Sequence, residues 1–188
     1  MTSGKGPIRA AIVGGHRGSG YGRAFDALQE RITLTAICDV DPEVIAGWRE
    51  TRPGIQGFTH FESLLESDVC DAVMLATPMQ LHATQAIAAL RAGKHVLSEV
   101  IAATTLEECW ALVEAVAHSG RVYMLAENYT YMRPNMMVRR MVEKGVFGTV
   151  YYAEGAYLHD CRNLGFDAGG ELTWRGALSR TAAGNVYP

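Results

Sequence analysis

The feature that most constrains the fold is an apolar run over residues 8–13, followed at once by five glycines within residues 14–22. The run is long enough for a buried strand and too short for a helix. From Tyr21 onward apolar side chains recur at helical spacing, so we expect the glycines in a turn between a strand and a helix. Such a turn lets the backbone approach a pyrophosphate, and the N–H groups at the helix start face the anion. The stretch therefore predicts a dinucleotide-binding fold.

The glycines do not match the G-x-G-x-x-G fingerprint in register, because the second glycine position falls on His16. One interpretation is a flexible turn and no more. The other, which we favour, assigns Gly14, Gly15 and Gly18 to the close backbone approach. His16 and Arg17 then belong to the same cofactor-binding turn.

An acidic residue supports the second interpretation. The predicted strand over residues 32–38 ends in Asp39, about 20 residues beyond the glycines, where a dinucleotide fold holds the adenosine ribose. A carboxylate there accepts hydrogen bonds from the ribose hydroxyls and repels a 2'-phosphate, which favours NAD over NADP. The alternative is that Asp39 only ends a strand. Asp41, followed by Pro42, is typical of a helix start.

Apolar runs and helical patterns alternate along the next part of the chain, as in an α/β doubly wound parallel sheet. After residue 128 the pattern changes. We therefore expect an NAD-binding Rossmann domain over residues 1–128 and, over 129–188, the incomplete beginning of an α/β open-sheet substrate domain. The further expected elements are a helix from Asp41, a strand near Phe58, a helix over 61–65, a strand over 71–76, a helix stopped by Gly93, a strand over 95–97, a helix capped by Thr105 and Glu108 and stopped by Gly120, a strand over 121–126, a helix over 134–144 and a long strand over 148–160.

Composition argues against several other classes of protein. The net charge is −3 with no basic run, so nucleic acid and anionic membranes are poor partners. No stretch resembles a signal peptide or a membrane span, and we expect a cytoplasmic protein. The cysteines lack C-x-x-C spacing, which argues against a metal site and a disulfide framework. They are Cys38, Cys70, Cys109 and Cys161.

The stretch "DAVMLATPMQLHATQAIAALRAGKHVLSE" over residues 71–99 resembles the Gfo/Idh/MocA family of NAD(P)-dependent oxidoreductases. The resemblance implies that the T-P-x-x-x-H motif of Thr77, Pro78 and His82 borders the cofactor, and that Glu99 contacts it. It also implies hydride transfer between NAD and a sugar or a sugar-like polyol.

One departure from that family is informative. Where most members have Glu-Lys-Pro, this chain has Glu99-Val100-Ile101. The family lysine is thought to orient or protonate the sugar oxygen, and valine can do neither. A branch that also lacks the lysine is the NAD-dependent retaining glycosidases resembling α-N-acetylgalactosaminidase. These enzymes oxidise a sugar hydroxyl, eliminate the glycoside, add water and reduce the ketone again, so the net reaction is hydrolysis.

Four later segments resemble the same branch, over residues 126–148, 155–162, 173–175 and 184–188. The resemblance places a first group of residues at the cofactor and sugar edge and a second group against the sugar hydroxyls or N-acyl group. A strand over residues 148–160 would turn Tyr157 and His159 to one face, where they could relay a proton; an amphipathic strand pair is the alternative. The first group is Glu127 and Asn128, and the second is Arg175 and Tyr187; the resemblance also implies that Tyr157 and His159 contact the sugar.

Three functions follow from these patterns. We rank an NAD-dependent oxidoreductase acting on a small-molecule sugar first, a redox-neutral NAD-dependent glycoside hydrolase second, and a non-catalytic NAD-binding module third. In the glycosidase-like branch a Thr and a catalytic His follow the position of Pro188, so we expect this chain alone to be inactive. The complete C-terminal sheet is expected to form a homo-oligomer.

Overall fold

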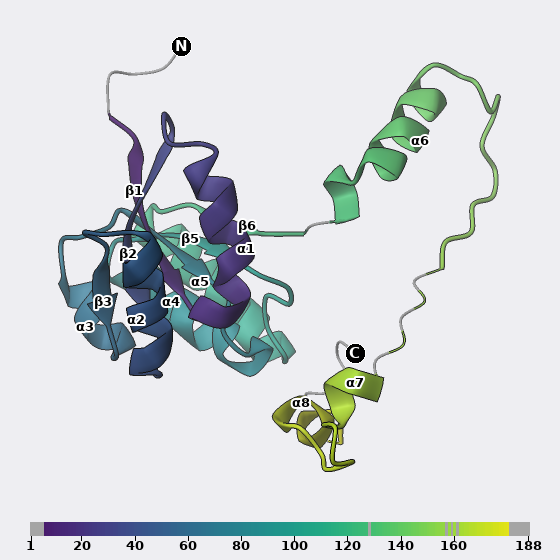
Figure 1. The fold of residues 1–188 in the computed structure, drawn as a ribbon. Coiled ribbons are helices and arrows are strands. Elements are labelled where there is room, and N and C mark those ends of the chain that lie inside the picture. Colours follow the sequence, from purple (N-terminus) through teal and green to yellow (C-terminus); the bar gives the residue numbers. More distant parts are fainter. Residues whose placement is uncertain (1–5, 128, 157, 159, 161, 181–188) are drawn as a thin grey trace. The chain divides into compact units, whose positions relative to one another are not determined.

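The computed structural model describes residues 6–127, 129–156, 158, 160 and 162–180. The chain divides into two units, Met1–Ala126 and Glu127–Pro188. The first unit contains a parallel sheet with helices on both faces, and the described part of the second contains helices (Figure 1).

The sheet of the first unit has six strands in the order β3-β2-β1-β4-β5-β6. All neighbouring strands are parallel. The chain runs outward from β1 to β3, returns to the centre and then runs outward from β4 to β6, which confirms the predicted doubly wound fold. The strands are β1 (Ile8–Val13), β2 (Ile32–Cys38), β3 (Gln56–Phe58), β4 (Ala72–Leu75), β5 (His95–Ser98) and β6 (Tyr123–Leu125).

Two of the helices between these strands begin at the caps that the sequence indicates. Asp41 caps α2 by accepting a hydrogen bond from the Glu43 N–H. Thr105 and Glu108 form the predicted capping box of α5, which ends at Gly120 in the left-handed conformation. No helix in the described part of the chain is long and apolar enough to cross a membrane. The helices and 3-10 turn of this unit are α1 (Gly15–Asp26), α2 (Pro42–Thr51), α3 (Phe61–Glu66), η1 (Met79–Leu81), α4 (His82–Arg91) and α5 (Leu106–Ser119).

Two hydrophobic clusters cover the two faces of the sheet. Successive residues of β1 belong to different clusters, with Ile12 in one and Val13 in the other. Trp48 from α2 packs in the cluster of Ile12, and Leu90 from α4 packs in that of Val13. Burial of both faces explains why the central strands read as continuous apolar runs.

The start of the first helix corrects our prediction. We expected helical structure from Tyr21, but α1 begins at Gly15, so most of the glycines lie inside the helix. A Cβ at Gly18 would lie 2.3 Å from Ile12 Cγ2, and one at Gly22 would lie 2.6 Å from the Trp48 ring. Glycine therefore lets α1 pack closely on β1 and α2. Helical spacing of apolar side chains missed this contact because glycine has no side chain to count.

The second unit also corrects a prediction. Residues 148–156, 158 and 160 form no strand, although we expected one over 148–160. A strand is stable only when a neighbour pairs with its backbone groups, and the described residues of this unit offer no such neighbour. One isolated antiparallel bridge joins Phe166 to Leu172. The helical segments are η2 (Tyr129–Tyr131), α6 (Arg133–Glu143), α7 (Arg162–Gly165) and α8 (Trp174–Leu178).

Candidate cofactor site

The carboxyl ends of the central strands meet at one edge of the first unit. The order of strands reverses between β1 and β4, and ligands of doubly wound sheets bind in the crevice at such a switch point. The structure brings four predicted residues to this edge. Gly14 follows β1, Asp39 follows β2, Thr77 lies just beyond β4, and Glu99 follows β5.

Gly14 makes the turn from β1 into α1 possible. Its φ is 93°, and a Cβ there would lie 2.5 Å from the Ala76 carbonyl oxygen and 2.9 Å from the Thr77 nitrogen. Only glycine fits this conformation and this approach. The turn is thereby held directly against the segment that leaves β4.

The N-terminus of α1 is suited to an anion. Its first turn contains no acidic residue, and His16 and Arg17 there are exposed. A helix of 12 residues places the positive end of its dipole at this point, where the Gly15 N–H donates to the Asp39 carboxylate. The arrangement can therefore bind the pyrophosphate of a dinucleotide.

Asp39 is fixed at the tip of β2 by two backbone groups. Its Oδ2 accepts a hydrogen bond from the Gly15 N–H at 2.6 Å, and its Oδ1 accepts one from the Asp41 N–H at 3.0 Å. A carboxylate retains lone pairs for further donors, such as ribose hydroxyls. In the preceding residue, burial first and the Asp39 charge second raise the pKa of the Cys38 thiol to about 11.

Glu99 is buried beside the first helix. Its Oε1 accepts a hydrogen bond from Arg17 Nε at 2.6 Å, and the guanidinium and carboxylate form an ion pair. The Tyr21 hydroxyl lies 3.3 Å from the same oxygen. The guanidinium compensates a carboxylate that is withdrawn from water. The pair also connects α1 to the end of β5.

Sequence reasoning missed the position of Tyr21 near Glu99. Arg17 and Tyr21 are four residues apart and share a face of α1, so both can reach one carboxylate. That signal was hidden because we expected the helix to begin only at Tyr21. Once the helix starts at Gly15, the spacing alone indicates the shared face.

His82 is almost fully buried, with 1% of its surface exposed. Its Nδ1 lies 2.8 Å from the Ile101 carbonyl oxygen and its Nε2 lies 2.9 Å from the Thr77 carbonyl oxygen. The ring nitrogens therefore face backbone groups of two loops. Pro78 follows Thr77 and precedes η1, while the Thr77 hydroxyl donates to Gln85 Oε1 at 2.6 Å.

The predicted sugar-binding residues belong to the second unit. The Glu127 carboxylate accepts a hydrogen bond from the Tyr129 N–H at 3.0 Å. Arg175 in α8 is exposed, and its guanidinium lies 5.2 Å from the centre of the Trp174 ring. The roles of both residues remain predictions. Four further predicted residues lie outside the described part of the chain: Asn128, Tyr157, His159 and Tyr187.

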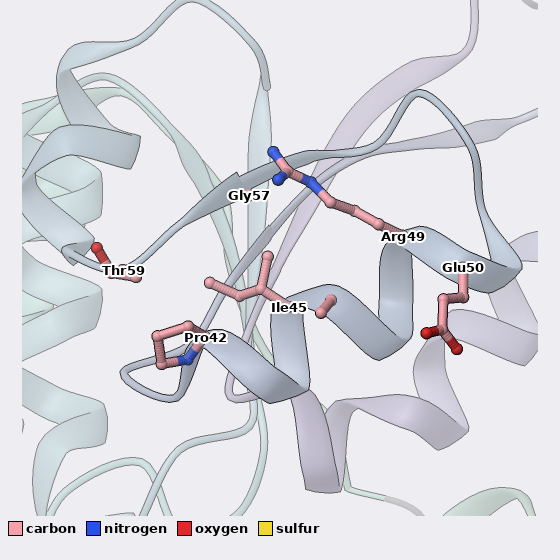
Figure 2. Close-up of a pocket in the computed structure, with 7 residues that line it drawn as sticks. Pro42, Ile45, Arg49, Glu50, Gly57 and Thr59 are labelled. Carbon is pink, nitrogen blue, oxygen red and sulfur yellow. The ribbon is translucent and has the colours of Figure 1, made fainter.

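A surface hollow of about 550 Å³ lies between α2 and β3 (Figure 2). The Arg49 side chain extends along it toward Gly57, and Ile45 forms part of its floor (Figure 2). The hollow shares no residue with the predicted cofactor set. Its lining residues are Pro42, Ile45, Ala46, Arg49, Glu50, Gly57 and Thr59.

Two family models match the chain in succession. Residues 8–127 match the oxidoreductase family with an NAD-binding Rossmann fold, Gfo/Idh/MocA. Residues 131–187 match the C-terminal domain of glycosyl hydrolase 109.

Curated relatives are also named as glycosyl hydrolase family 109 proteins. A Glycosyl hydrolase family 109 protein of Saccharopolyspora erythraea is 37% identical over an alignment of 195 positions, which covers 96% of this chain and 42% of the relative. One of Solibacter usitatus is 34% identical, over 97% of this chain and 44% of the relative. The chain thus spans less than half the length of these relatives.

Among solved structures, the WlbA dehydrogenase of Bordetella pertussis, in complex with NADH and UDP-GlcNAcA, is 32% identical with a TM-score of 0.70. The match covers 77% of this chain and 44% of that one. The WlbA dehydrogenase of Chromobacterium violaceum, with the same ligands, is 28% identical with a TM-score of 0.72, over 79% of this chain and 43% of that one. The matched family model covers more than half of the residues, so the chain belongs to the Gfo/Idh/MocA oxidoreductase family, with an NAD-binding Rossmann domain followed by glycosyl hydrolase 109 C-terminal sequence.

Proposed function

We propose that this chain is part of an NAD-dependent glycoside hydrolase whose net reaction leaves NAD unchanged. The match of residues 131–187 to the glycosyl hydrolase 109 C-terminal domain carries the proposal. Val100 supports it, because this residue replaces the lysine that serves hydride transfer in most of the family and cannot bind or donate a proton. From the sequence we ranked net oxidation first and the hydrolase second; the matches to glycosyl hydrolase 109 sequences support the hydrolase.

The residues at the carboxyl edge fit NAD. Gly14 and the start of α1 with Gly15 and Gly18 would hold the pyrophosphate, since the close packing of Gly14 on the Ala76–Thr77 peptide places the N-terminus of α1 at this edge. Asp39 would accept hydrogen bonds from the adenosine ribose. Bound there, NAD would supply a hydride acceptor that is restored within each turnover.

The second half of the sheet would serve the nicotinamide end. A doubly wound fold consists of two mononucleotide-binding halves, and β4, β5 and β6 form the second. Glu99 at the end of β5 is held by Arg17, so its carboxylate has a fixed orientation at this edge. We assign Asn128 to the same end of the cofactor.

The sugar would contact residues of the second unit. We assign the proton relay to Tyr157 and His159, and recognition of hydroxyl or N-acyl groups to Glu127, Arg175 and Tyr187. An N-acetylated amino sugar is the proposed substrate class. Two observations support it: the resemblance to α-N-acetylgalactosaminidase-like enzymes, and the UDP-GlcNAcA bound by the similar WlbA dehydrogenases.

Net sugar oxidation is the second candidate function. It is favoured by the match of residues 8–127 to the oxidoreductase family and by the dehydrogenase names of the WlbA structures. In that case NADH would accumulate in step with the oxidised sugar. The hydrolase would accumulate none.

A two-signal assay separates the candidates. Two proteins are compared: the 188-residue chain, and a version of it extended by whatever the natural reading frame encodes. Each is incubated with NAD and p-nitrophenyl N-acetyl-α-galactosaminide, while p-nitrophenolate and NADH are followed by absorbance. We expect the extended version to release p-nitrophenol without net NADH, and the release to require NAD. Accumulation of NADH would assign the oxidoreductase reaction. Binding of NAD without either signal from the extended version would leave a non-catalytic NAD-binding module.

A further inference from the structure

We propose that Trp48 is a positioning residue that sets where the N-terminus of α1 lies relative to the tip of β2. It acts through contacts of its indole ring along one side of α1. The inference rests on the proposed function in one respect, namely that the pyrophosphate of NAD binds at the start of α1. Trp48 itself would touch neither the cofactor nor the reacting atoms.

The indole is bonded to the first residue of α1. Trp48 belongs to α2 and is 7% exposed, and its Nε1 donates a hydrogen bond to the Gly15 carbonyl oxygen at 3.2 Å. The indole nitrogen only donates and the carbonyl oxygen only accepts, so the direction of this bond is fixed. A carbonyl oxygen has two lone pairs, so Gly15 can accept this bond as well as the helical bond from the residue four positions on.

The same ring lies against α1 at two glycines. A Cβ at Gly15 would lie 2.9 Å from the indole Nε1, and a Cβ at Gly22 would lie 2.6 Å from Cη2 of the ring. These glycines are seven residues apart, which places them on one face of the helix, about two turns from each other. The absence of side chains at both positions lets the ring lie along this face.

A guanidinium stacks on the indole and connects it to the other end of α1. The Arg52 Cζ lies 4.8 Å from the centre of the Trp48 ring, and Arg52 Nε donates to Asp26 Oδ1 at 3.3 Å. Arg52 and Asp26 also form an ion pair. Because Asp26 is the last residue of α1, Trp48 and Arg52 together fasten α2 to both ends of that helix.

These contacts bear on the cofactor site through Gly15. Its N–H is bonded to Asp39 and its carbonyl oxygen to Trp48, so the two peptide groups that flank Gly15 are each held by another element. Loss of the indole N–H would release one of them and let the start of α1 move. Asp39 would keep its other bond, from the Asp41 N–H, so the ribose end of the site should change less than the pyrophosphate end.

Two variants disturb the ring in different ways. Trp48→Phe keeps an aromatic ring but removes the N–H and the far edge of the indole. Gly22→Ala leaves the indole unchanged but places a Cβ 2.6 Å from it, so the ring must shift. Gly20→Ala is the matched control, because a Cβ there meets nothing within 4 Å. Circular dichroism of each variant defines a temperature at which all of them are folded.

Displacement of NADH gives the readout. NADH is bound first, followed by its own fluorescence, and is then displaced by adenosine or by ADP. Adenosine lacks the pyrophosphate, so the ratio of the two affinities isolates the pyrophosphate end. In Trp48→Phe we expect the affinity for ADP to fall about threefold to tenfold, the effect of one net hydrogen bond, and that for adenosine to stay within about twofold of wild type. Gly22→Ala should show the same pattern, and Gly20→Ala should bind both ligands as wild type does.

A merely structural tryptophan would lower the unfolding temperature and leave the ratio of the two affinities unchanged. An unchanged ratio in Trp48→Phe, or an equal change of the ratio in Gly20→Ala, would overturn the inference while leaving the proposed cofactor in place. Failure of the wild-type chain to bind NADH would overturn the proposed cofactor site, and the inference with it. If Trp48→Phe does not fold, the ratio in Gly22→Ala decides the question.

Discussion

The Asp39 carboxylate and the Gly15 backbone N–H are joined by a hydrogen bond of 2.6 Å. This contact links the tip of β2, where the ribose would bind, to the first residue of α1, where the pyrophosphate would bind. The two predicted parts of the NAD site, the acidic tip of β2 and the N-terminus of α1, are therefore bonded directly to each other. Substitution of Asp39 tests both at once.

We expect Asp39→Ala to weaken NAD binding by ~1 to 3 kcal/mol, the range for losing hydrogen bonds to a charged group. Isothermal titration calorimetry measures the change directly. Asp41→Ala is the matched control, because it removes the cap of α2 and should lower stability by about 1 kcal/mol without changing NAD affinity. Equal NAD affinity in wild type and Asp39→Ala would show that the ribose binds elsewhere.

The chain should prefer NAD to NADP. The 2'-phosphate of NADP would meet the Asp39 carboxylate at short range, and Arg17, the nearest base of the turn, is already paired with Glu99. Titration with both cofactors checks the preference, and Asp39→Ser should reduce it. Comparable affinities in the wild-type chain would mean that a base outweighs the carboxylate.

Two glycines of α1 should respond in opposite directions to alanine. Gly18→Ala places a Cβ against Ile12 in the core, and overpacking of this kind costs about 1 to 3 kcal/mol. Gly20→Ala meets nothing within 4 Å and should stabilise the helix by roughly 0.5 to 1 kcal/mol. Chemical denaturation of the two variants beside wild type measures both effects. Similar stability changes in both would contradict the packing described for α1.

The first unit should lose stability in acid through two carboxylates. Hydrogen bonds from the Arg9 side chain lower the pKa of Asp71, and those from Thr104 lower the pKa of Glu108. A lowered folded-state pKa gives stability that is complete above the unfolded value, near 4, and disappears as the pH falls through the folded value. Urea unfolding from about pH 7 to about pH 3 should show this decline.

Glu108→Gln should flatten part of that acid dependence. Glu107→Gln is its control, because the Glu107 side chain makes no hydrogen bond within the described structure. An acid profile that is identical in wild type and Glu108→Gln would contradict the assigned role of the capping box.

The sequence predicted the sheet well because each strand has its own local signal. The runs over residues 8–13 and 32–38 are bounded by proline, glycine or charged residues, and the structure has strands with these bounds. The helix caps are equally local: Asp41 and Thr105 bond to the first turn of the helix that each begins, and Gly120 ends the helix directly before it. Local signals of this kind need no knowledge of the partner elements.

What the sequence did not predict depends on contacts between distant residues. The early start of α1 follows from packing of Gly18 on Ile12, and the burial of His82 follows from two loops that meet only in the folded sheet. The expected strand over residues 148–160 has alternating residues, but alternation without a pairing neighbour does not make a strand. The sugar-binding assignments stay predictions, because several of these residues lie outside the described part of the chain.

The high pKa of Cys38 has a consequence for how this protein would tolerate oxidants. The thiolate is the form that reacts with peroxides and disulfides, and a thiol whose pKa is raised to about 11 by burial is held in its protonated form at neutral pH. Because Cys38 is also 3% exposed, its sulfur is shielded sterically as well as chemically. The strand that carries Asp39 would thus remain unmodified under oxidative stress that consumes accessible thiols.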